Sequence, residues 1–368
     1  MNTKTKKAPS LRKEKLIKDT YPKTLEGPRK AIRANLFKPN TLKAILMSAI
    51  GISFHLISYI IIYYALSQNN NILLVIGWFL AGTSITSLFV LGHDCAHSSF
   101  LKNNKWNDIL GHFYFLFSFY PYYAWKYSHN AHHAHTNQLF SSDKDVYFDN
   151  AWLPFTVDEY FTLKKNSPTH AFIYRLTRYF PPFGSLLHNI VFQYFPSKYI
   201  PNHRKKLVIS YTFLFFGILG LSMVFYKITG NLFSIFHFLI IPALIFQFWM
   251  SYYTYLHHTA TNIKFYDKKD WTPYIGQIVS TYNCLNPKFI SFLHFHIDIH
   301  TPHHISTAIP CYNLPEAYND LLKSEFAKDL KQGAFKFSYL FNQMMNCHLW
   351  DEKEGVYITF KQAKLREV

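Results

Sequence analysis

Three clusters of histidine are the residues of this chain whose type and spacing point to chemistry. They read HDCAH from His93 to His97, HNAHH from His129 to His133 and HTPHH from His300 to His304. Imidazole is the commonest side-chain ligand for iron, copper and zinc, so the residue type indicates a metal site without naming the metal.

The first two clusters have the spacing of residues on one face of a helix. Positions three or four apart are neighbours on a helix surface. We therefore expect His93 with His97, and His129 with His132 and His133, to direct their rings at common points.

The third cluster resembles the start of a helix. Thr301 and Pro302 are typical of an N-cap and of the first helical position. This interpretation places His300 just before the helix and His303 and His304 in its first turn.

The number of clustered histidines indicates two metal ions. A structural zinc takes about four ligands and a catalytic zinc about three plus water, and the clusters contribute eight. The chain has 20 histidines in all, so isolated ones need no function; this applies to His55, His112, His170, His188, His203, His237 and His348.

Apolar residues are concentrated in four runs. Each run reaches the roughly 20 residues that a helix needs to cross a bilayer; the runs are residues 42–66, 72–92, 207–226 and 232–256. Lys43 is the one charged residue within them. Only short turns separate the first run from the second and the third from the fourth. The sequence therefore predicts an all-α integral membrane protein with two transmembrane hairpins.

Positive charge predicts which side of the membrane the histidines occupy. Lys and Arg number 12 each in residues 1–42, 93–206 and 257–368, against Lys227 alone in the two short turns. Positive residues favour the cytoplasmic side, so we expect both termini and all three clusters there. Residues 1–42 are then a basic arm without a signal peptide, and residues 43–368 form one domain whose cytoplasmic cap is 93–206 and 257–368.

The absence of other catalytic motifs narrows the range of possible reactions. There is no HExxH, GxGxxG or P-loop lysine, and the four cysteines show no CxxC. The expected metal site is therefore rich in histidine and poor in carboxylate. Such a site at a membrane surface points to oxygen activation by two irons on a lipid.

The order HDCAH, then WKYSHNAHHAHTN, then HFHIDIHTPHHISTAIPCYNLPEAY resembles the membrane fatty acid desaturases. The match is close to the cyanobacterial Δ12 acyl-lipid type and extends from about Ala31 to Phe360. It includes the aspartate-rich stretch from Asp143 to Trp152, YLHHT after the fourth run, and NCHLWDEKEGVYITF near the C-terminus. One departure is Ala96, where this subgroup often has glycine in the first cluster.

The resemblance implies a fold and a ligand set. Two helix hairpins lie under a cytoplasmic helical cap, and the cap holds two iron ions (Fe²⁺). His258 falls where the family often has a ninth ligand, with His257 as its competitor. The implied ligands are His93, His97, His129, His132, His133, His258, His300, His303 and His304.

The resemblance also implies the reaction, which is the oxygen-dependent introduction of a cis double bond into a lipid-bound acyl chain. The implied substrate is an oleoyl chain and the implied electron donor is ferredoxin. The implied location is the thylakoid or plasma membrane if the cell is cyanobacterial.

Alternative functions remain beside this one. They are another histidine-rich di-iron lipid oxidase (an ω-3 desaturase, hydroxylase or ketolase), a membrane zinc hydrolase, and a metal carrier or sensor. Carboxylates expected to orient the histidines are Asp94, Asp143, Asp145 and Asp298.

Overall fold

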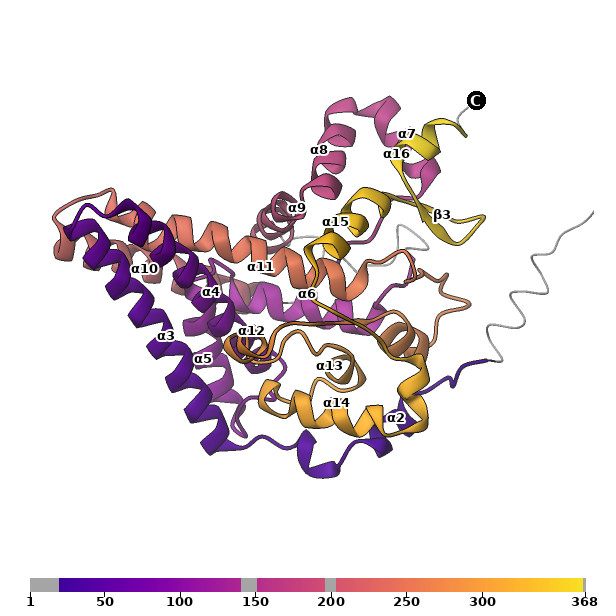
Figure 1. Cartoon of the computed structure of the whole chain (residues 1–368), viewed down its shortest axis with the longest axis horizontal. Coiled ribbons are helices and arrows are strands. Elements are labelled where there is room, and N and C mark those ends of the chain that lie inside the picture. The colour runs from indigo at the N-terminus through magenta and orange to yellow at the C-terminus, as the bar shows by residue number, and fades with distance from the viewer. Residues whose placement is uncertain (1–19, 140–150, 196–202, 367–368) are drawn as a thin grey trace, which may run out of the picture.

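The computed structural model describes residues 20–139, 151–195 and 203–366, and over these ranges the chain is mostly helical (Figure 1). Four helices are long and apolar enough to cross a membrane. They are α3 (Thr41–Ser67), α4 (Asn71–Ala96), α10 (Arg204–Thr229), and Phe236–His258, which is the π-helical turn η4 (Phe236–Ile240) continued by α11 (Ile241–His258). They overlap the four predicted runs, and α4 continues past residue 92 into the first histidine cluster.

Helices α3 and α4 form a packed hairpin. Each begins at an asparagine whose side-chain oxygen accepts a backbone N–H: Asn40 from Lys43 and Asn70 from Leu73, both at 3.0 Å. Such caps satisfy N–H groups that the helix leaves unpaired. Gly77 lets the helices approach closely, because a Cβ there would lie 2.8 Å from Ile62 Cγ1.

Helices α4 and α11 are the inner pair and α3 and α10 the outer pair. In their apolar stretches, 61% and 56% of the residues of the inner pair are buried, against 22% and 17% for the outer pair. The inner helices meet where Trp249 Nε1 donates to Thr83 Oγ1 at 3.1 Å. The outer helices present apolar side chains outward, as a lipid-facing surface requires.

The second predicted hairpin is looser than the first. Phe225 of α10 stacks on Phe238 of η4 with ring centroids 4.5 Å apart, close to the turn. Beyond the turn, α11 packs mainly on α4 and on α9 (Pro181–His188), whereas α10 packs on α5 (Asn104–Leu116) and α6 (Tyr122–His135). Short connections in the sequence did not reveal this divergence.

The remaining elements lie between α6 and α10 and after α11, and among them α13 (Thr301–Ile305) carries the third histidine cluster. Between α6 and α10 lie α7 (Val157–Asn166), α8 (Pro168–Tyr179), α9 and the π-helical turn η2 (Asn189–Gln193). After α11 come η5 (Ile275–Val279), β1 (Tyr282–Leu285), α12 (Lys288–Leu293), α13 (Thr301–Ile305), η6 (Cys311–Asn313), α14 (Leu314–Leu322), η7 (Glu325–Asp329), β2 (Lys331–Ala334), α15 (Phe337–Asn346), β3 (Leu349–Asp351), β4 (Val356–Ile358) and α16 (Phe360–Lys364). Strand β1 pairs in parallel with β2, and β3 antiparallel with β4. The expected all-α fold therefore carries two small sheets.

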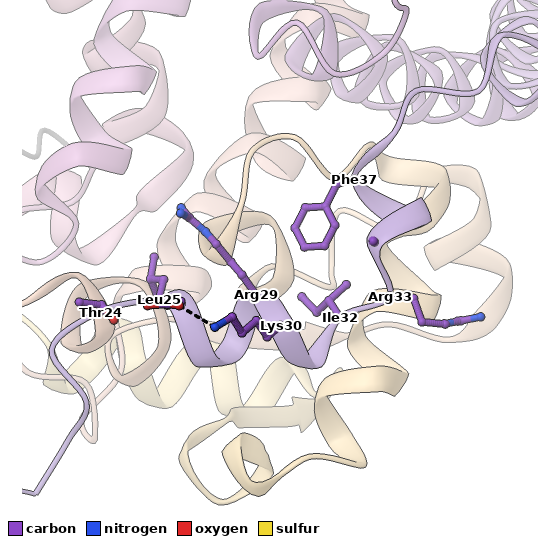
Figure 2. Close-up of a pocket in the computed structure, with 9 residues that line it drawn as sticks. Thr24, Leu25, Arg29, Lys30, Ile32, Arg33 and Phe37 are labelled. Atoms are coloured by element: carbon purple, nitrogen blue, oxygen red, sulfur yellow. Dashed lines mark hydrogen bonds and ion pairs between the residues drawn. The ribbon is translucent and has the colours of Figure 1, made fainter.

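The described part of the basic N-terminal segment packs onto the C-terminal part of the chain. Helix α2 (Glu26–Ala31) lies against α14, and Leu36 of the 3-10 turn η1 (Ala34–Phe37) accepts at its backbone oxygen from Asn313 Nδ2 at 3.0 Å. Ile32 and Leu36 are buried in the main core. Arg33 pairs with Asp320 at 2.9 Å and with Glu316 at 3.0 Å. A surface hollow opens here (Figure 2), lined by Thr24, Leu25, Glu26, Arg29, Lys30, Ile32, Arg33, Ala34 and Phe37. Residues 20–42 of the predicted basic arm are therefore folded against the C-terminal part of the chain, and residues 1–19 lie outside the described residues.

The close approach of α4 and α11 predicts that Gly82 tolerates no side chain. A Cβ at Gly82 would lie 2.5 Å from Ile245 Cβ and 2.9 Å from the backbone oxygen of Pro242. We expect Gly82→Ala to lower the free energy of unfolding by about 1–3 kcal/mol, as overpacking does, measured as a lower thermal midpoint in detergent. Gly220→Ala on α10 is the matched control, because a Cβ there meets nothing within 4 Å. Equal midpoints for the two variants would contradict this account of the packing.

Candidate metal centre

Four separate segments present the histidines. His93 lies in the last turn of α4 and His97 is its C-cap residue. Helix α6 presents the second cluster, α11 ends at His258, and the third cluster belongs to α13. One detail of the prediction is wrong: His300, not Thr301, is the N-cap residue of α13.

The nine predicted histidines gather in two groups. Within each group the candidate ligand nitrogens lie within 4.8 Å of one another. The five-histidine group is His93, His97, His129, His133 and His303, and the four-histidine group is His132, His258, His300 and His304. No carboxylate or cysteine of the described residues belongs to either group.

The nitrogens that face one another have the spacing of ligands around an ion. In the five-histidine group, His129 Nε2 lies 3.1 Å from the Nε2 atoms of both His93 and His133, and His133 Nε2 lies 2.9 Å from that of His303. In the four-histidine group the Nε2 atoms of His258 and His300 are 2.9 Å apart. Two imidazoles bound at about 2.1 Å and at right angles place their nitrogens about 3 Å apart. The residues therefore fit one metal ion in each group.

Burial favours the neutral form of six of these imidazoles, and the neutral form is the one that binds a metal. Burial lowers the pKa of His303 well below its usual range, and repulsion from His93 and His133 lowers it further. The same two causes, burial first and neighbouring histidines second, lower the pKa values of His97, His129, His133, His300 and His304.

Two of the rings are oriented through the nitrogen that faces away from the group. His93 Nδ1 lies 3.2 Å from Asp94 Oδ1, and Asp94 Oδ2 accepts the backbone N–H of Cys311 at 2.6 Å. His304 Nδ1 lies 2.6 Å from Gln277 Oε1. Such contacts fix the tautomer and the orientation of a metal-binding histidine.

Of the carboxylates expected to orient the histidines, Asp94 is the one that the structure places against a ligand ring among the described residues. Asp298 accepts from the backbone N–H of Asn286 at 3.0 Å and from Ser291 Oγ at 2.7 Å, and neither partner is one of the nine histidines. Asp143 and Asp145 lie outside the described residues.

The neighbouring histidines lie outside both groups. His257 stacks on His300 with ring centroids 3.8 Å apart. Its alternative, His258, lies inside the four-histidine group. His294 is bonded to Tyr253 Oη at 2.7 Å, and His135 Nδ1 to Gln138 Oε1 at 2.8 Å.

Sequence reasoning missed two polar residues that support the groups. Gln277 is one polar residue in the apolar run from Tyr274 to Val279, and that interruption is the sequence signal that could have revealed it. Asn283 Oδ1 accepts the backbone N–H groups of His300 at 2.8 Å and Thr301 at 2.9 Å, so it caps α13. An asparagine in a strand, 17 residues before the residue it caps, leaves no sequence signal.

Comparisons with known proteins agree with this geometry. The fatty acid desaturase family model matches residues 70–333, which contain all nine histidines. The chain is similar to the sn-1 oleoyl-lipid 12-desaturase of Picosynechococcus sp., with 34% identity over 294 residues that cover 78% of this chain and 80% of that protein. The protein of the same name from Synechocystis sp. is 35% identical over 79% of this chain and 80% of its own length. The chloroplastic omega-6 fatty acid desaturase of Spinacia oleracea is 36% identical over 79% of this chain and 62% of its own length.

The lowered histidine pKa values predict how the metal-free protein responds to pH. The folded pKa values of residues such as His129 and His133 lie below the unfolded value of about 6.5. Between those values the unfolded chain binds protons that the folded chain does not, so stability falls as pH falls below about 6.5 and returns above it. The slope is at most about 1.4 kcal/mol per pH unit for each histidine.

The measurement is the thermal midpoint of the metal-free protein in detergent across this pH range. Replacing one buried ring, in His129→Phe, should make the slope shallower. An unchanged slope would show that His129 does not stay neutral in the folded chain.

Proposed function

This chain belongs to the fatty acid desaturase family, and we propose that it converts a lipid-bound oleoyl chain to linoleoyl by introducing a cis double bond at the Δ12 position. The position of the double bond rests on relatives named sn-1 oleoyl-lipid 12-desaturases and omega-6 desaturases. One observation carries the reaction class: histidines from four segments converge in two groups at the ends of membrane-length helices.

We assign one iron to each histidine group, so that the nine histidines are the ligands of a two-iron centre. Bound iron supplies the activation of oxygen that removes hydrogen from two adjacent methylenes. A single-zinc hydrolase would need about three protein ligands and would leave one complete group without a role. The two complete groups therefore support a centre of two metal ions, and membership of the desaturase family supports iron as the metal.

The side chains around the groups prepare them for this chemistry. Asp94 accepts from His93 Nδ1 and so leaves His93 Nε2 directed at the five-histidine group. Trp125 stacks on His129 with centroids 4.2 Å apart and is itself only 5% exposed. This indole covers one side of the group, and excluding water in this way limits side reactions of a strong oxidant.

The charge distribution supports a cytoplasmic centre. Both histidine-bearing helix ends, at His97 and His258, belong to the side of the spans that carries the Lys- and Arg-rich segments 93–206 and 257–368. We place both termini and the centre on that side of a multi-pass membrane protein. In a cyanobacterial cell this membrane would be the thylakoid or plasma membrane.

The proposal predicts a new fatty acid in a host that makes oleate. Expression of the chain together with a ferredoxin should yield 18:2 with double bonds at Δ9 and Δ12, identified by gas chromatography with mass spectrometry. His303→Ala should lower the yield more than about 100-fold, because it removes a proposed ligand and not merely a group that orients one. His188→Ala is the matched control, since His188 lies outside both groups.

Each outcome separates the alternatives. A hydroxylated or keto product would assign the chain to a different histidine-rich lipid oxidase. An unchanged acyl profile with the protein in the membrane would contradict desaturation, and full activity in His303→Ala would contradict the ligand assignment.

The electron donor in our proposal is ferredoxin, a small acidic protein. The chain carries a formal net charge of +17, and complementary charge accelerates encounter between partners. We expect the rate of reduction by ferredoxin to fall several-fold as the Debye length shortens from about 30 Å at 0.01 M salt to about 8 Å at 0.15 M salt. Stopped-flow reduction at a series of salt concentrations measures this, with a small neutral reductant as the control. A salt-independent rate with ferredoxin would rule out electrostatic steering.

A further inference from the structure

Gln277 touches both histidine groups without belonging to either. It lies on η5, a π-helical turn, and its side chain is buried with 4% exposure. Its Oε1 lies 2.6 Å from His304 Nδ1, and its Nε2 donates to the backbone oxygen of His133 at 2.6 Å. One amide thus joins a residue of the four-histidine group to the helix that carries a residue of the five-histidine group.

These two contacts determine the tautomer of His304. The backbone oxygen of His133 can only accept, so the amide nitrogen of Gln277 must face it. The amide oxygen therefore faces His304 Nδ1, and an oxygen acceptor requires the proton on that nitrogen. His304 Nε2 is then left with a lone pair. That atom is buried and has no hydrogen-bond partner.

A second set of contacts fixes Gln277 itself. Thr136 Oγ1 lies 3.1 Å from Gln277 Oε1, and the backbone oxygen of Thr136 accepts from Trp271 Nε1 at 2.8 Å. The indole of Trp271 lies against Gly276, where a Cβ would approach it to 2.7 Å. Gly276 therefore allows the close contact that sets the position of η5 beside the end of α6.

We propose that Gln277 is a positioning residue of the metal centre, which holds His304 with Nε2 directed into the four-histidine group and keeps α6 in register with α13. The inference rests on the proposed two-metal centre. It goes further by assigning the integrity of the four-histidine group to a residue that binds no metal.

The test measures metal binding by the full-length chain in detergent, independently of desaturation. The metal-free protein is titrated with Fe²⁺ under anaerobic conditions, and the bound metal is counted by mass spectrometry at each free concentration. Gln277→Met keeps the approximate size of the side chain and removes both hydrogen bonds. We expect it to weaken one of the two binding steps by about 10–100-fold and to leave the other unchanged.

Two further variants separate positioning from a general loss of stability. Gln343→Met is the matched control, because Gln343 is also buried and its Oε1 accepts from the backbone N–H of Thr261 at 2.9 Å, outside both groups. It should bind both ions like the unaltered chain. Gln277→Glu restores an acceptor opposite His304 Nδ1, so it should bind the affected ion more tightly than Gln277→Met.

The inference is overturned if Gln277→Met binds both ions with unchanged affinity, if Gln343→Met weakens the same step equally, or if Gln277→Glu binds no better than Gln277→Met. A different result marks failure of the proposed function. If the unaltered chain binds no second ion, the two-metal centre itself is wrong, and the role of Gln277 falls with it.

Discussion

The structure depends on gathering nine imidazole rings around two points that water reaches poorly. A buried polar group is costly unless its hydrogen-bonding atoms have partners. In this chain the nitrogens that face inward lie about 3 Å from one another, and some outward-facing ones are held by Asp94 and Gln277. Such an arrangement survives only if the surrounding helices cannot relax. The packing of the helices therefore determines whether the histidines can bind metal.

The inner helix α4 is the part of the scaffold that is held most firmly by its neighbours. It is buried continuously from Ala81 to its end at Ala96, whereas the outer helices are buried only in part. Glycines at contact points bring neighbours close; at Gly92, next to His93, a Cβ would lie 2.4 Å from Phe115. Close-packed neighbours leave a helix no room to shift. The position of His93 is thereby set by residues that do no chemistry.

Helix α13 is held in position by hydrogen bonds from other segments. It needs them because five residues cannot form a stable helix alone. Asn283 caps its start, and the hydroxyls of Thr281 and Thr301 lie 2.9 Å apart. At its other end, Arg29 Nε donates to the backbone oxygen of Ile305 at 3.0 Å. The described N-terminal segment therefore supports the helix that carries His303 and His304.

These particulars show how far the sequence could lead. Spacing on a helix correctly predicted that His129 and His133 direct their rings at one point, but the expectation that His132 shares that point was wrong. The four apolar runs located the membrane-length helices. Helix geometry separates the rings of His132 and His133, but the group that His132 joins depends on the positions of His258 on α11 and of His300 and His304 at α13, which spacing does not give. Gln277 and Asn283 were missed because the residues that they contact are distant in sequence. Asp298 was near the third cluster in sequence but is bonded elsewhere.

The division of adjacent histidines follows from helix geometry. Successive side chains on a helix diverge by about 100°, because a turn contains about 3.6 residues. The pairs His132 with His133 and His303 with His304 each place one ring in the four-histidine group and the other in the five-histidine group. Helices α6 and α13 thus serve both groups. Any shift of one helix along the other would disturb both groups at once, and this is why a single amide that joins α6 to α13 can matter to the whole centre.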